Sequence, residues 1–98
     1  MYAIVWEYEV KPEAEARFRS AYGPDGPWAT LFTASPGFMG VDLYRADDAA
    51  GRFLTIDRWR SRDAFVEFMS RNAEAYAALD EKFGDMTVRE SRLGDIEA

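Results

Sequence analysis

The chain has 98 residues, of which 48% are hydrophobic and 31% charged, and its formal net charge is −6. This length and balance predict one globular domain over residues 1–98 and argue against disorder. The excess of acidic residues argues against a nucleic-acid partner, and no apolar run approaches the ~20 residues that a membrane helix needs. Because the first residues also lack the basic and long apolar segments of a signal peptide, a cytoplasmic location is expected.

Cysteine and histidine are both absent from the chain. The first absence excludes disulfides, thiolate nucleophiles and Cys-based zinc or iron–sulfur sites. The second excludes Ser-His-Asp catalysis and removes the commonest general base near neutral pH. We therefore expect no metal site, and any chemistry must use carboxylates, Arg, Lys, Tyr, Trp, amides or the substrate itself.

Residues 2–10 (YAIVWEYEV) alternate with the period of a β-strand, and Trp6 lies on the more apolar face. A helix is expected to open at Pro12, because proline suits the first helical turn. Its buried stripe should consist of Ala14, Phe18, Ala21 and Tyr22. Gly23 is a natural residue to end this helix.

The segment 23–27 (GPDGP) is the densest cluster of helix- and strand-breaking residues, so it predicts a loop. A short second helix begins at Pro27, with Trp28, Leu31 and Phe32 on one face. The rings around this loop, Tyr22, Trp28 and Phe32, have two interpretations. They either close over a site for an aromatic ligand or cap the end of the core.

The second half of the chain begins with a strand over residues 38–45 (FMGVDLYR) and a hairpin turn over 47–51. The next strand, 53–59 (FLTIDRW), carries Asp57 and Trp59 on one face. At Ser61, a good N-cap residue, the spacing becomes helical. This helix should bend near residues 70–72 and end at Gly84. A last strand over 86–93 (MTVRESRL) and a frayed tail over 95–98 complete the chain.

The predicted order is strand, helix, strand, strand, helix, strand, which is typical of an α+β ferredoxin-like βαββαβ fold. Such connections place the helices on one face of a four-stranded antiparallel sheet and leave the other face open. The strands supply apolar residues to both faces. We therefore expect a homodimer that forms through the open sheet face.

The run from Ser35 to Phe68 resembles the antibiotic biosynthesis monooxygenase (ABM) family. Three segments carry the resemblance: Ser35-Pro36-Gly37-Phe38 before a strand, Asp57-Arg58-Trp59 at the end of the hairpin, and the helix start Ser61-Arg62-Asp63-Ala64-Phe65. The resemblance implies a dimeric α+β barrel, in which two ferredoxin-like sheets face each other. It also implies oxygenation of polycyclic aromatic phenols without flavin, haem group or metal, and therefore no cofactor. The substrate loses a proton, and its carbanion reduces dioxygen itself.

Under this resemblance, Trp59 stacks on or orients the substrate, and Asp57 or Tyr22 handles protons. Arg45 or Arg89 stabilises the substrate anion. The rings expected to bind the substrate are Trp6, Trp28, Phe32, Phe65 and Phe68. Plainer roles are also open: Trp59 as a core residue at the strand–helix joint, and Asp57 as an exposed strand carboxylate. Arg45 and Arg89 would then be cross-strand partners of acidic residues or simply exposed.

Three functions remain open from the sequence. The first is a cofactor-independent monooxygenase acting on a phenolic or quinone-like small molecule. The second is a non-catalytic, dimeric, stress-related or ligand-binding protein whose pocket holds a small apolar or aromatic molecule. The third is a non-oxidative enzyme, such as a cyclase or isomerase. The sequence therefore leaves open whether the protein is an enzyme.

Overall fold

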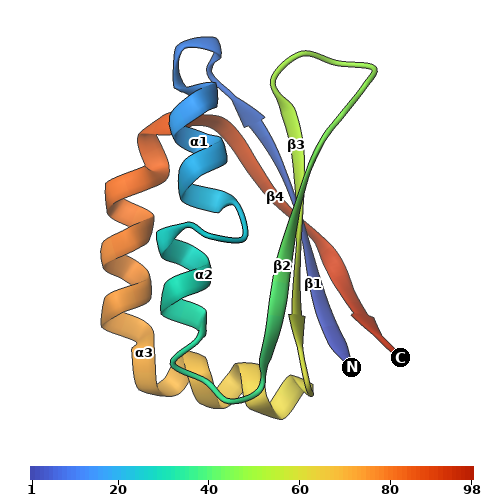
Figure 1. Ribbon diagram of the computed structural model, residues 1–98, viewed down its shortest axis with the longest axis vertical. Coiled ribbons are helices and arrows are strands. Elements are labelled where there is room, and N and C mark those ends of the chain that lie inside the picture. Colours follow the sequence, from blue (N-terminus) through green and yellow to red (C-terminus); the bar gives the residue numbers. More distant parts are fainter.

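The computed structural model describes all of residues 1–98. Its sheet has four antiparallel strands in the order β2-β3-β1-β4. The strands are β1 (Tyr2–Val10), β2 (Phe38–Arg45), β3 (Arg52–Trp59) and β4 (Thr87–Glu97), and the helices are α1 (Glu15–Tyr22), α2 (Pro27–Phe32) and α3 (Arg62–Phe83). All three helices lie on one face of the sheet, as Figure 1 shows. The predicted α+β ferredoxin-like βαββαβ fold is confirmed.

The central strand β3 turns every second side chain toward the helices. Its buried residues are Phe53, Thr55, Asp57 and Trp59, in the period-two pattern that the sequence predicts. Pairing with β1 sets Asp57 opposite Ile4, and therefore beside Trp6 on the same face. A carboxyl group thus lies within a layer of apolar and aromatic side chains.

Helices α1 and α2 cover the sheet with the aromatic stripe that the sequence predicts. Phe18, Tyr22, Trp28 and Phe32 are all buried. The helix α1 ends at Gly23, whose backbone N–H donates to the carbonyl oxygen of Arg19 at 3.1 Å. The short loop after Gly23 lets α2 follow directly, so the rings of both helices meet above the same part of the sheet.

Helix α3 begins and bends where the sequence predicts. The Ser61 hydroxyl accepts a hydrogen bond from the Ala64 backbone N–H at 3.1 Å, which caps the helix. Asn72 has non-helical angles (φ −125°, ψ 22°), and its side-chain Nδ2 donates to the Phe68 carbonyl oxygen at 3.0 Å. The two halves of α3 therefore run in different directions, which Figure 1 shows clearly. No helix of the protein combines the length and the apolar character that crossing a membrane requires.

Trp59 is the centre of an aromatic cluster at the joint between β3 and α3. It is fully buried, and its ring centroid lies 5.2–5.5 Å from those of four phenylalanines: Phe32, Phe38, Phe65 and Phe68. Gly37 permits the close approach of this region to α3, because a Cβ atom there would lie 2.5 Å from the Ala64 Cβ. The glycine of the Ser35-Pro36-Gly37-Phe38 segment thus has a packing role.

The prediction of a frayed tail over residues 95–98 is wrong, because β4 continues to Glu97. The register pairs Tyr2 with Glu97 and Ile4 with Asp95. The Tyr2 hydroxyl also donates to Asp95 Oδ2 at 2.6 Å. Since β1 already begins at Tyr2, its backbone offers hydrogen-bond partners that hold the last residues in the sheet.

Candidate functional site

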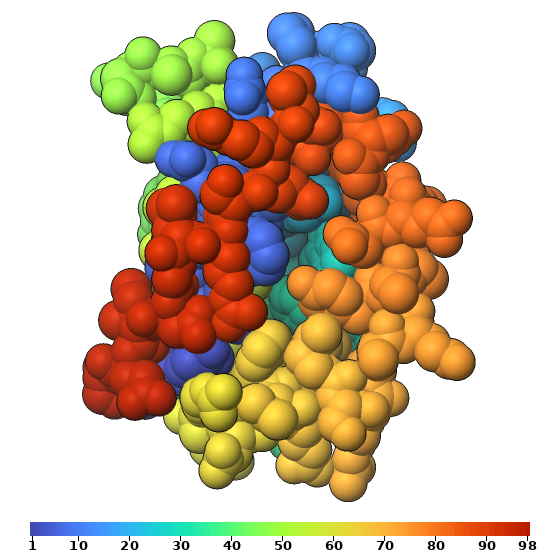
Figure 2. All heavy atoms as spheres, turned by 180° about the vertical axis from the view of Figure 1, so that it is seen from behind, coloured from blue at the N-terminus to red at the C-terminus, as the bar shows by residue number.

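A cavity of about 210 Å³ lies between the sheet and the helices. Figure 2 shows it from behind, as a hollow between the red strand β4 and the orange part of helix α3. Six aromatic side chains line it: Trp6, Tyr8, Tyr22, Trp28, Phe32 and Tyr76. The remaining lining residues are Val41, Thr55, Asp57, Asp80 and Glu90. This is a concave, mostly aromatic pocket with a few polar groups, which is the usual form of a small-molecule site.

The aromatic walls support one another through direct ring contacts. Tyr22 lies between Tyr8 and Trp28, with ring centroids 5.2 and 5.9 Å away. The ring of Tyr76 from α3 meets Trp28 edge to face at 4.9 Å. Phe18, behind Tyr22, stacks on it at 4.3 Å. Because each ring is held by others, the walls are pre-organised for a flat, apolar ligand.

Asp57 is the only acidic side chain buried in the protein, with 9% of its surface exposed. No protein group forms a hydrogen bond with its carboxyl, although the side chain lines the cavity. Burial raises its pKa to about 7, and the positive charge of Arg92 opposes that shift. A carboxyl with a pKa near neutral is suited to accept and return a proton.

The hydroxyl and indole groups in the cavity keep their protons at neutral pH. Burial raises the pKa of Tyr76 to about 12 and also raises the pKa values of Tyr8 and Tyr22. The Tyr8 hydroxyl shares a hydrogen bond of 3.0 Å with Thr55 Oγ1. By contrast, the Tyr22 hydroxyl and Trp28 Nε1 are buried and neither forms a well-aligned hydrogen bond, although the indole N–H lies near enough to the hydroxyl to lower its pKa slightly against the effect of burial. Such groups lower the stability of the empty site, and a ligand with oxygen atoms would satisfy them.

The sequence-predicted site residues fall into two groups. Trp6, Tyr22, Trp28, Phe32 and Asp57 come together around the cavity. Trp59, Phe65 and Phe68 do not line it. Trp59 lies behind Phe32, with ring centroids 5.5 Å apart, and its Nε1 has no hydrogen-bond partner.

Arg45 and Arg89 are exposed, and neither lines the cavity. Arg45 is the last residue of the edge strand β2. Arg89 pairs with Glu9 and belongs to a separate surface hollow beside Glu7. The cavity therefore has no cationic residue in its wall, and no group of His, Cys, Asp and Glu side chains is placed to hold a metal ion.

The sequence interpretation did not select Tyr8, Val41, Thr55, Tyr76, Asp80 and Glu90 as site residues. The signal for Tyr8 and Thr55 was present, because each lies two positions from a selected residue on the same strand face. Asp80 and Glu90 carried no such signal. They meet at the cavity only because α3 bends at Asn72 and β4 returns beside β1.

Comparison with known proteins identifies a family and several similar structures. Residues 1–79 match the sequence profile of the family described as antibiotic biosynthesis monooxygenase. A variant of SnoaB, a cofactor-independent oxygenase from Streptomyces nogalater, is similar with a TM-score of 0.80 and 22% identity, covering 99% of this chain and 91% of that one. A proposed antibiotic biosynthesis monooxygenase from Bordetella bronchiseptica has a TM-score of 0.75 and 19% identity, covering 99% and 95%. At these identities the likeness concerns the fold. No curated protein matches the chain significantly.

Proposed function

Because the chain belongs to the antibiotic biosynthesis monooxygenase family, we propose that it oxygenates a phenolic or quinone-like aromatic molecule without a cofactor. The cavity beside Asp57 is the proposed site of this reaction. The observation that carries the proposal is Asp57 itself: a buried carboxyl with a pKa of about 7 and no protein hydrogen-bond partner, set among aromatic rings. This combination suits removal of a proton from a flat aromatic substrate.

The reaction can be written for a hydroxyanthrone, in which a ring CH₂ group becomes a carbonyl. Ionised Asp57 takes one proton from this carbon, and the resulting carbanion passes one electron to dioxygen. The two radicals join through a new C–O bond. Loss of the second C–H proton then breaks the O–O bond and forms the carbonyl. The outer oxygen leaves as water with the two protons, so one oxygen atom of dioxygen enters the product.

The unpartnered donors give the substrate its orientation in this scheme. The Tyr22 hydroxyl and Trp28 Nε1 would donate to substrate oxygen atoms, while the rings of Trp6 and Tyr76 would lie against its faces. Trp59 has a positioning role, because it supports Phe32 from behind and does not line the cavity.

Oxygen consumption tests the proposal directly. With a hydroxyanthrone, we expect the protein to raise dioxygen uptake above the spontaneous rate, and the product to contain one added oxygen atom and two fewer hydrogens. Heat-unfolded protein is the matched control for trace metals. A product with rearranged atoms but no added oxygen would instead indicate a cyclase or isomerase.

A second candidate function is binding without catalysis. The observation in its favour is the absence of a cationic lining residue, because developing negative charge on a substrate would meet no positive side chain in the wall. Saturable binding of the hydroxyanthrone with no oxygen uptake would favour this function over the oxygenase.

We also propose that two copies of the chain associate through the sheet face that carries no helix (Figure 1). This face presents Val5, Leu54 and Ile56, together with half-exposed Tyr44 and Ile96. Apolar area of this kind is usually covered by a partner.

Sedimentation should therefore give about twice the monomer mass of 11.2 kDa at micromolar concentration. Ile56→Glu should dissociate the dimer, because a charge would be buried at its centre. The matched control is Val66→Glu on the exposed surface of α3, which should leave the mass unchanged. A monomeric wild-type protein would contradict this proposal.

A further inference from the structure

The charged residues of the cavity are all acidic and all unpaired. Asp57 lies inside, and Asp80 on α3 and Glu90 on β4 also line the cavity from exposed positions. None of the ion pairs of the protein involves any of the three. The site therefore carries uncompensated negative charge around aromatic walls.

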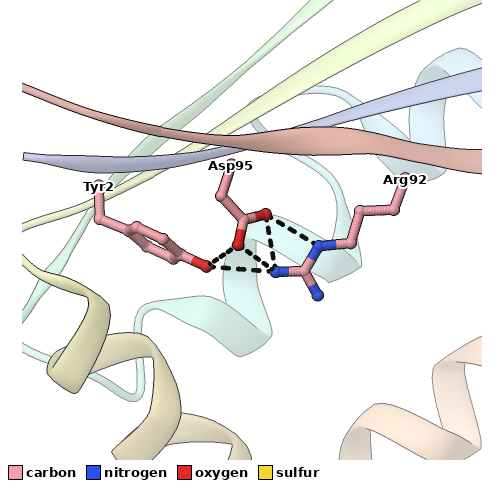
Figure 3. A network of polar contacts seen from close by, with 3 residues as sticks. All are labelled: Tyr2, Arg92 and Asp95. Atoms are coloured by element: carbon pink, nitrogen blue, oxygen red, sulfur yellow. Dashed lines mark hydrogen bonds and ion pairs between the residues drawn. The ribbon is translucent and has the colours of Figure 1, made fainter.

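The one cation whose charge acts on Asp57, Arg92, is already paired with another carboxylate. As Figure 3 shows, the Arg92 guanidinium turns toward Asp95, with Nε and Nη2 donating to Oδ1 at 3.0 and 2.9 Å. Its Nη2 also donates to the Tyr2 hydroxyl at 3.2 Å. Because Asp95 already balances Arg92, and no ion pair of the protein involves Asp80 or Glu90, a cationic group of a ligand could pair with these two carboxylates.

Asp80 and Glu90 belong to the two elements that border the opening of the cavity. Although Glu90 as a whole is exposed, its carboxyl is partly shielded from solvent, which raises its pKa, and repulsion from the negative charge of Asp80 raises this pKa further. A cation between the two carboxylates would remove this repulsion. Tyr22 and Tyr76 line the same cavity, and the charges of Asp80 and Glu90 act on both hydroxyl groups, so aromatic side chains lie near the position of such a cation.

The carboxyl group of Asp57, inside the cavity, gives a second, independent indication of a ligand. Asp57 is nine-tenths buried and has no hydrogen-bond partner, so the hydroxyl group of a ligand could donate the missing hydrogen bond to its carboxyl. The volume of 210 Å³ is below the roughly 300 Å³ at which pockets for drug-sized ligands begin. A ligand whose hydroxylated ring fills the cavity would therefore extend its remaining atoms to the opening.

We propose that the natural ligand is a phenolic or quinone-like molecule that also carries a protonated amine. Its ring lies among the aromatic walls with an oxygen atom toward Asp57, and its ammonium group lies between Asp80 and Glu90. This inference rests on the proposed function and names the substrate class of the same site.

Three phenols of matched shape test whether the site prefers a positively charged ligand. They are tyramine, para-ethylphenol and para-hydroxyphenylpropionate, which are cationic, neutral and anionic at neutral pH. Binding is followed by NMR of the indole N–H signals of the three tryptophans. The Trp28 signal should shift, whereas that of Trp59, outside the cavity, should not. We expect tyramine to bind about tenfold or more tightly than para-ethylphenol at low ionic strength, and the propionate to bind most weakly. Molar salt should reduce this preference.

The double variant Asp80→Asn/Glu90→Gln should bring the affinity ratio of tyramine to para-ethylphenol close to one. Glu74→Gln/Glu81→Gln, two substitutions on the exposed surface of α3 outside the cavity, is the charge-matched control and should keep the ratio. Equal binding of tyramine and para-ethylphenol to the wild type would overturn the inference and leave the proposed site intact. If none of the probes shifts the Trp28 signal, the cavity does not bind phenols, and both the inference and the proposed function fail.

Discussion

Asp57→Asn is expected to lower the rate of hydroxyanthrone oxygenation by about a hundredfold or more, because asparagine cannot accept the proton. In the wild type, kcat/KM should rise with pH and level off above about 7, where Asp57 is ionised. The variant should lose this rise. Asp85→Asn, which removes an exposed carboxylate outside the cavity, is the matched control. Equal rates for wild type and Asp57→Asn would contradict the role of Asp57 as base.

The same substitution should stabilise the fold at alkaline pH. The folded-state pKa of Asp57, about 7, lies above its ordinary value near 4, so the folded protein holds this proton more tightly than the unfolded chain does. The contribution of Asp57 to stability is therefore fully present below about pH 4, and it is lost as the pH rises to about 7. Asparagine resembles the protonated form and avoids this loss.

The predicted gain for Asp57→Asn at about pH 8 is on the order of 4 kcal/mol, or roughly 15 °C or more in Tm. At about pH 4 the two proteins should unfold alike. Calorimetry at both pH values measures the difference. The chain has no histidine or cysteine side chain to titrate in the same range, which simplifies the assignment. A variant that is less stable at alkaline pH would show that Asp57 is not held in an unfavourable environment.

Trp59→Ala should destabilise the protein by about 3–5 kcal/mol, a large fraction of the stability of a domain this size. The indole is fully buried among four phenylalanine rings, so its removal leaves a cavity that the cluster cannot fill. Trp59→Phe should cost less, because a ring remains and the unpartnered Nε1 is removed. Denaturant unfolding of both variants measures the cost.

The oxygenation rate of Trp59→Phe separates the two interpretations of this tryptophan. If Trp59 only supports Phe32, the variant should keep most of its kcat and change mainly in KM. A stable variant that loses activity as completely as Asp57→Asn would show that the indole contacts the substrate.

The sequence was informative wherever local chemistry decides the structure. Period-two alternation identified the buried face of β3, and the Ser61 cap and the bend at Asn72 were both predictable. The end of β4 was not, because a polar C-terminal segment becomes a strand only when the first residues of β1 offer it partners. The pairing of the last residues of β4 therefore depends on contacts with a distant part of the chain and not on the local sequence.

The candidate site shows the same limit. Asp57 and the rings of Trp6, Tyr22 and Trp28 could be selected from strand faces and the breaker-rich loop. Trp59 shares a strand face with Asp57, yet the packing of Phe32 and Phe68 encloses it. Asp80 and Glu90 come from distant parts of the chain, so only the fold brings their charges together.

The central claim is that the protein oxygenates an aromatic substrate in the cavity beside Asp57. Dioxygen labelled with heavy oxygen tests it most directly, with product mass measured for wild type and Asp57→Asn under the same conditions. The claim predicts one labelled oxygen atom per product molecule from the wild type, formed faster than in the absence of protein. It also predicts that the variant forms this product about a hundredfold or more slowly than the wild type. Labelled product at equal rates from both proteins, or from neither above the spontaneous rate, would contradict the claim.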